Sequence, residues 1–199
     1  MLAYRREMLS DEELLARWMS GDKTAGAQVV DRLYPRVEAY FRSRLRAEDV
    51  KEGVQETFAR LMAKPENFSG KSRLIAYLLG IARYVFIDIV RGRYALQLDP
   101  LTHSVEAIHQ IGQSGMASRV DLQECLRALS LRDQDLLELF YWQGLSHREI
   151  GELMDMNVNT VKAHLFNARE RLRKMMVEHG ALSAEDDTLE AHLLKAASF

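Results

Sequence analysis

The stretch GLSHREIGELMDMNVNTV, residues 144–161, decides the fold, because it has the layout of two short helices joined by a tight turn. Gly144 is expected to end the preceding helix. Ser146 is expected to cap the next one, and Glu149 lies at the spacing of a capping box. Residues 155–157 form the turn, and its last member, Asn157, is a good N-cap for a second helix. The stretch predicts a helix-turn-helix.

The second helix of this pair is predicted to have one buried and one exposed face. At about 100° per residue, one narrow arc holds the apolar residues Val161, Leu165, Ala168 and Leu172. The opposite arc offers amide, cationic and aromatic groups: Asn159, Lys162, Ala163, Phe166, Arg169 and Arg173. Such groups suit base edges, phosphates and thymine methyls in a major groove. A plain structural hairpin is the alternative, and the caps and the basic face favour DNA contact.

The residues before position 94 predict a helical bundle. Ser10 and Glu13 form a capping box, a helix is expected over 23–34, and Pro35 opens the next segment, 36–46. A helix over 48–62 carries one apolar stripe, residues 64–71 are a loop, and 74–90 is a buried helix. No alternating strand pattern is present, so we expect an all-helical domain that ends near Arg93.

The predicted fold class is all-α, with two small helical domains joined by a flexible linker. The expected limits are 10–93 for the first domain, 94–118 for the linker, 119–177 for the second domain and 178–199 for an acidic C-terminal extension. Within the extension, residues 184–197 could form an amphipathic helix with Leu189, Leu193 and Leu194 facing inward. This helix either folds back on the basic second domain, as a regulatory or stabilising element, or is a solvated extension.

Composition excludes several classes of protein. The 199 residues carry a net charge of −2 and one cysteine, Cys125, which is expected in the core. No apolar run approaches the length of a signal peptide or membrane span, so we expect a cytoplasmic, nucleoid-associated protein. No phosphate-binding loop, catalytic motif or metal-ligand spacing is present, and the six histidines are scattered. We expect no catalytic activity, cofactor, metal, membrane partner or small-molecule substrate.

The two predicted domains resemble a known family. The sequence LSLRDQDLLELFYWQGLSHREIGELMDMNVNTVKAHLFNARERLR, from Leu129, resembles region 4 of extracytoplasmic-function (ECF) sigma factors of the sigma-70 family. In the first domain, VQETF at residues 54–58 is similar to the region 2 motif DLVQETF, and IAR at 81–83 begins a segment similar to IARNxxxDxxR. Gly53 replaces a usual Leu. In region 4, a Ser-, Arg- and His-rich surface is replaced by Ala163, His164, Phe166 and Asn167.

The resemblance implies a transcription initiation factor that binds core RNA polymerase, at its largest-subunit clamp and its flap, and that binds promoter DNA. An anti-sigma protein is a further candidate partner. The residues implied in core binding form an acidic helix face: Glu48, Asp49, Glu52, Gln55 and Glu56. Those implied in holding the melted −10 element are aromatic or cationic: Phe68, Tyr77, Arg83, Tyr84 and Arg91. Those implied at the −35 element lie on or beside the second helix of the pair: Asn157, Asn159, Thr160, Lys162, His164, Phe166, Asn167 and Arg169.

Other interpretations remain open at this point. The acidic face could be merely solvated, and Phe68 and Tyr77 could be core aromatics. Phe166 could contact thymine or pack on the tail helix. The main functional alternative is a stand-alone helix-turn-helix regulator that binds an operator without polymerase. A protein that mimics a sigma factor is a weaker alternative.

Overall fold

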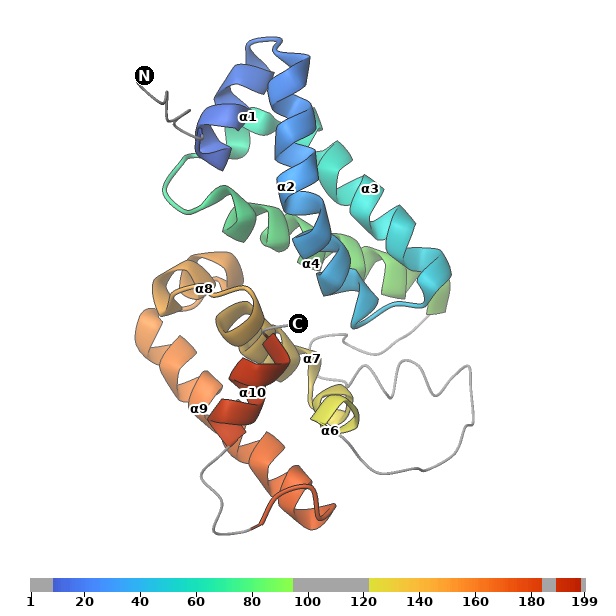
Figure 1. The fold of residues 1–199 in the computed structure, drawn as a ribbon, viewed down its shortest axis with the longest axis vertical. Coiled ribbons are helices and arrows are strands. Elements are labelled where there is room, and N and C mark those ends of the chain that lie inside the picture. Colours follow the sequence, from blue (N-terminus) through green and yellow to red (C-terminus); the bar gives the residue numbers. More distant parts are fainter. Residues whose placement is uncertain (1–8, 95–121, 184–188, 198–199) are drawn as a thin grey trace, which may run out of the picture. The chain divides into compact units, whose positions relative to one another are not determined.

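The computed structural model describes residues 9–94, 122–183 and 189–197 (Figure 1). These residues form helices and contain no β-strand, so the predicted all-α class is confirmed. Contacts divide the chain into two compact units, Met1–Phe86 and Ile87–Phe199, which are described separately. Almost all of the predicted linker, 94–118, lies outside the described residues, and the domain limits given above remain predictions.

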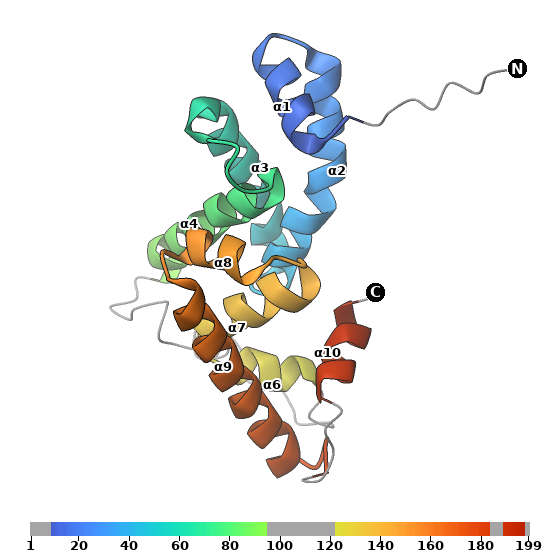
Figure 2. The same cartoon turned by 90° about the vertical axis from the view of Figure 1, so that its left-hand side faces the viewer.

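The first unit is a helical bundle. Its elements are α1 (Asp11–Met19), α2 (Lys23–Arg42), α3 (Ala47–Ala63), a 3₁₀ turn η1 (Pro65–Asn67) and the start of α4 (Leu74–Tyr94). Helix α2 packs against both α1 and α3 (Figure 2). The predicted capping box is present at the start of α1, where Ser10 and Glu13 bond to each other's backbone N–H groups. The Glu12 carboxylate accepts a hydrogen bond from the backbone N–H of Leu74, at 2.8 Å, and so ties α1 to the start of α4.

The predicted helix boundary at Pro35 is wrong, because α2 runs through it without interruption. Proline lacks an N–H, so the carbonyl of Asp31 loses its helical partner. Pro35 is exposed, which leaves this carbonyl accessible to water. The buried residues Leu33 and Val37 lie on either side of the proline in one apolar stripe, and their burial favours a continuous helix.

The second unit contains the predicted helix pair. Its elements are α6 (Leu122–Ala128), α7 (Leu131–Leu137), a π-helical turn η2 (Glu138–Trp142), α8 (His147–Met154), α9 (Val158–Glu178) and α10 (Leu189–Ala197). Helix α9 packs against α6, α7 and α8, and α10 packs against η2. Cys125 is buried, as predicted.

The helix-turn-helix has the predicted caps and turn. Ser146 and Glu149 form the capping box of α8, and Asn157 accepts the Thr160 N–H at 2.8 Å at the start of α9. Between the helices, Asp155 adopts the left-handed conformation, with φ 55°. Gly151 lies under this turn, where an added Cβ would come within 2.6 Å of the carbonyl oxygen of Met156. The residues predicted to form the inner face of α9, from Val161 to Leu172, are buried.

The C-terminal helix α10 is docked rather than solvated over its described residues. Leu189 and Leu193 are buried, as expected, whereas Leu194 is 53% exposed and was wrongly predicted to face inward. Helix α10 therefore belongs to the folded second unit. Among the helices in the described part of the chain, none combines the length and apolar character needed to cross a membrane.

Candidate functional site

The first candidate surface is the acidic face of α3. Glu48, Glu52, Gln55 and Glu56 are all exposed on this helix. Glu56 is held by an ion pair with Arg60, one turn later, at 2.7 Å. The four side chains therefore present carboxylate and amide oxygens to a partner.

Asp49 does not belong to this surface, although the sequence analysis placed it there. Its side chain is 1% exposed and interacts within the protein. On a helix, residue 49 falls between the exposed face and the apolar stripe of Val50 and Val54, and the fold turns it inward. We remove Asp49 from the candidate surface. Phe58, for which we expected a core position, is half-buried.

The second candidate surface surrounds the loop between α3 and α4. Phe68, in the loop, and Tyr77, in the first turns of α4, are half-buried, and their rings pack at a tilt of 48° with centroids 5.4 Å apart. Burial, together with the negative charge of Glu66, raises the pKa of Tyr77 above its usual value of 10.0. Tyr77 therefore keeps its phenol proton and remains a hydrogen-bond donor near neutral pH.

Further along α4, the predicted residues separate into two groups. Tyr84 is 61% exposed and Arg91 is exposed. A spacing of seven residues places Tyr77, Tyr84 and Arg91 on one side of this continuous helix. Arg83, in contrast, is only 9% exposed and interacts within the protein. Its charge is explained by an internal role, and we remove it from the candidate DNA-binding set.

The third candidate surface is the outer face of α9. Asn159, Ala163, Phe166 and Asn167 are exposed along it, and Phe166 is 55% exposed. Positively charged residues lie on either side of this neutral strip, residues 159–167: Lys162, Arg169 and Arg173 on one side, and Arg171 and Lys174 toward the other. The exposed Glu170 lies in line with the strip, one turn beyond Phe166. An amide and apolar strip between cationic margins suits base edges between two phosphate backbones.

Three predicted −35 residues have additional structural roles or surroundings. The side-chain oxygen Oδ1 of Asn157 caps α9 by accepting a hydrogen bond from the backbone N–H of Thr160. Thr160 itself is half-buried. His164 is also half-buried and lines a pocket beside α9. These three residues lie at the margin of the exposed strip rather than at its centre.

Arg169 is held by groups from two other elements. Its Nη1 donates a hydrogen bond to the Tyr141 hydroxyl at 3.3 Å, and Tyr141 donates to Glu190 Oε1 of α10 at 3.4 Å. Arg169 Nη1 also lies 3.9 Å from the same carboxylate oxygen. Burial raises the pKa of Tyr141 above 10.0, so its hydroxyl stays protonated. Sequence reasoning missed Tyr141, because a Tyr in an apolar run carries no sign of a polar role.

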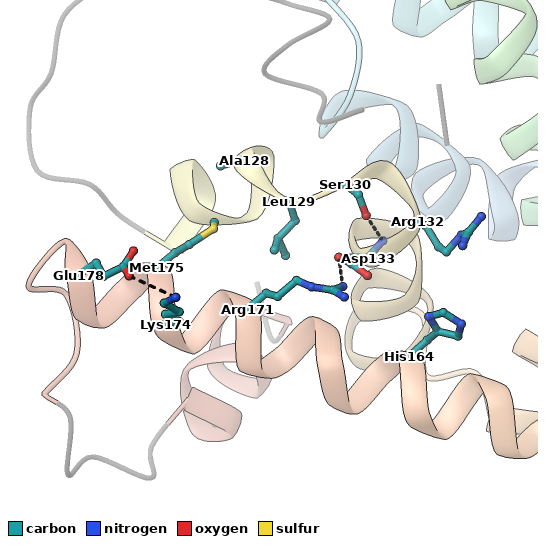
Figure 3. Close-up of a pocket in the computed structure, with 10 residues that line it drawn as sticks. All are labelled: Ala128, Leu129, Ser130, Arg132, Asp133, His164, Arg171, Lys174, Met175 and Glu178. Atoms are coloured by element: carbon teal, nitrogen blue, oxygen red, sulfur yellow. Dashed lines mark hydrogen bonds and ion pairs between the residues drawn. The ribbon is translucent and has the colours of Figure 1, made fainter. Parts of the chain in front are cut away.

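A cationic pocket of about 560 Å³ lies between α7 and α9 (Figure 3). Arg132, His164, Arg171 and Lys174 line it, together with two acidic residues. Asp133 binds Arg171 at 2.6 Å, and Glu178 lies 3.9 Å from Lys174. Of the four basic residues that line this pocket, the sequence analysis named only His164 as a candidate for DNA binding.

Comparison with protein families gives two matches in the order predicted. The sigma-70 region 2 model matches residues 29–95, and the sigma-70 region 4 model matches residues 119–172. The chain is 27% identical over 180 residues to the ECF RNA polymerase sigma-E factor of Haemophilus influenzae, which covers 83% of this chain and 95% of that protein. It is 28% identical over 180 residues to the ECF RNA polymerase sigma factor SigK of Mycobacterium tuberculosis, covering 84% and 94%.

Solved structures share the fold. The structure of CnrH in complex with the cytosolic domain of CnrY matches with a TM-score of 0.63 and 22% identity, over 83% of this chain and 96% of that one. The sigma factor RpoE of Bartonella quintana, solved with the anti-sigma factor NepR, matches with a TM-score of 0.56 and 21% identity, over 75% and 95%.

Proposed function

Because the chain belongs to the ECF group of the sigma-70 family, it directs RNA polymerase to promoters without catalysing a reaction itself, and we propose how its surfaces divide this work. The acidic face of α3, formed by Glu48, Glu52, Gln55 and Glu56, binds the clamp of the largest polymerase subunit. The exposure of all four side chains supports this role, since charge complementarity steers association with a basic partner.

The loop after α3 and the outer side of α4 hold the melted −10 element. Unstacked bases bind to aromatic rings and cationic groups, and stacking contributes about 1–3 kcal/mol per base. Tyr84 and Arg91 are exposed for this purpose. Phe68 and Tyr77, whose rings pack against each other, are half-buried and so are partly accessible to a base.

The neutral strip of α9 reads the −35 element in the duplex. This strip, bordered by cations on both sides, is the observation that carries the proposal. Asn159 and Asn167 suit adenine edges, whereas Phe166 and Ala163 suit thymine methyls. Lys162 and the other cations on either side of the strip bind phosphates of the DNA backbone. A chain of net charge −2 binds DNA weakly by itself, so polymerase supplies much of the affinity.

The test is a pull-down with purified core RNA polymerase, followed by run-off transcription on a genomic promoter library. We expect stable binding to core and discrete new start sites preceded by shared −10 and −35 sequences. Binding to DNA without binding to core would instead support a stand-alone regulator.

The proposal extends to a protein partner of the chain and to its place in the cell. The complexes of CnrH with CnrY and of RpoE with NepR support an anti-sigma protein as a partner of this chain as well. A factor that works on polymerase and promoter DNA acts in the cytoplasm, at the nucleoid. Co-purification from cells, with and without stress, would identify an anti-sigma partner.

A further inference from the structure

The C-terminal helix α10 packs on the second unit through buried apolar side chains. Leu193 is fully buried and Leu189 is nearly so, and α10 packs against η2. Burial of two leucines contributes about 3–6 kcal/mol before the cost of ordering the helix is subtracted. This contact positions the first turn of α10, and with it Glu190, beside α9.

Glu190 reaches a cation on the margin of the DNA-reading strip. Arg169 lies one turn after Phe166, and its guanidinium carbon is 6.0 Å from the Phe166 ring centroid. The Arg169 side chain is 33% exposed and is drawn toward Tyr141 and Glu190. Because the hydroxyl of Tyr141 accepts from Arg169 and donates to Glu190, it links the two charges.

A DNA phosphate and the Glu190 carboxylate would compete for the same guanidinium. Tyr141 and Glu190 engage only Nη1 of Arg169, so a phosphate could still reach its other N–H groups, but the nearby carboxylate already offsets part of the guanidinium charge. The exposed carboxylate also repels a phosphate that approaches this margin. Docked α10 therefore opposes one of the contacts that region 4 needs.

We propose that α10 is an intramolecular brake, which lowers the affinity of region 4 for promoter DNA by holding Arg169 with Glu190. This rests on the proposed function, in which α9 binds the −35 element. The brake acts through one charge–charge contact on a docked helix, so its release adds about one phosphate contact to the complex.

The test uses the full-length chain in holoenzyme and a promoter duplex identified by run-off transcription. Glu190→Gln keeps the size of the side chain and removes its charge. We expect it to tighten promoter binding severalfold at low salt. We also expect the plot of log affinity against log salt to become steeper by about 0.9, as for one added phosphate contact.

The matched control is Glu152→Gln. It removes the same charge from the same domain, from an ion pair at 3.0 Å with Arg148 on α8, which is not among the cations that border the strip. It should leave both affinity and salt slope unchanged. In an Arg169→Gln background, Glu190→Gln should give a much smaller gain, because only the repulsion between Glu190 and the phosphate is then removed.

Leu193→Ala separates braking from structural support. If α10 is a brake, undocking it raises promoter affinity even though the thermal stability of the domain falls. Unchanged or weaker binding by both Glu190→Gln and Leu193→Ala would overturn the brake. If the unmodified holoenzyme does not prefer the identified −35 sequence to a scrambled one, the proposed function is overturned instead.

Discussion

At the scale of single residues, Gly53 is a packing feature of α2 and α3. The family usually has Leu at this position, yet a Cβ added here would lie 2.8 Å from Cε1 of Phe41. Phe41 is fully buried and occupies the space that a larger side chain at 53 would need. The packing of Phe41 against this position thus accounts for the departure from the family pattern.

Gly53→Leu should therefore destabilise the first unit by about 1–3 kcal/mol, the usual cost of overpacking a core. Thermal or urea unfolding measures the effect. In a Phe41→Ala background the same change should cost much less, because the clashing ring is gone. Gly92→Ala is the control: no atom lies within 4 Å of its added Cβ, and we expect equal or slightly higher stability. Equal costs in both backgrounds would contradict this packing.

The turn of the helix-turn-helix depends on a second residue. Asp155 has φ 55° and ψ 51°, a conformation that glycine adopts without steric cost. The short polar side chain of Asp tolerates this region better than other side chains do.

Asp155→Gly should raise the stability of the second unit, by up to about 1 kcal/mol, since relief of strain exceeds the added entropy of the unfolded chain. Asp155→Ala should lower it, because Ala pays the steric cost without a local polar contact. Unfolding midpoints of the two variants test the sign. A loss of stability with Gly would show that Asp155 contributes an interaction that offsets its strain.

At the scale of elements, α3 combines a buried stripe with an exposed acidic face. The stripe of Val50, Val54 and Leu61 fixes the rotation of the helix about its axis, and this rotation decides which acidic residues face outward. The sequence pattern predicted the stripe, but Asp49 lies near its edge. Only the packed structure assigns it to the inside.

Glu52→Lys should weaken binding to core RNA polymerase by about tenfold, near 1.4 kcal/mol, by reversing a charge at the centre of this face. The loss should shrink as salt rises, because exposed charges are screened. Asp31→Lys, an exposed reversal on α2, is the control and should bind normally. Equal losses for both variants would point to net charge rather than to the α3 face.

At the scale of the whole molecule, the two surfaces proposed to bind promoter DNA, around the loop after α3 and on α9, belong to different compact units of one chain. If each binds one short element, the covalent link raises the effective concentration of the second unit to roughly millimolar once the first has bound. Promoter recognition by this chain therefore depends on the covalent connection between the two units as much as on the contacts that each unit makes with DNA.

Cleaving the chain at a protease site inserted within residues 95–121 should lower run-off transcription about 100-fold or more at micromolar protein. The uncleaved chain with the same insertion is the control. Raising the concentration of the two halves should restore part of the activity. Full activity after cleavage, at low concentration, would mean that polymerase alone positions both units.

Sequence reasoning succeeded where a local rule dominates. Capping residues, apolar spacing and turn chemistry predicted the helix-turn-helix and most helix limits, because these depend on neighbours in the chain. It failed at Pro35, Asp49, Arg83 and Leu194, where tertiary packing decides whether a helix continues or which way a side chain faces. The contact of Arg169 with Glu190 depends on α10 docking, which charge patterning suggested only in outline.

The hydrogen bond from the backbone N–H of Leu74 to Glu12 joins α4 to a helix that lies outside the residues matched by the region 2 model. The region 2 match begins at residue 29, after α1 has ended, yet Glu12 caps α4, the helix after the loop proposed to hold the −10 element, 62 residues along the chain. A chain trimmed to the matched residues would leave the N–H of Leu74 without this acceptor. An inherited defect in promoter opening could thus map to α1, far along the gene from any residue that touches DNA.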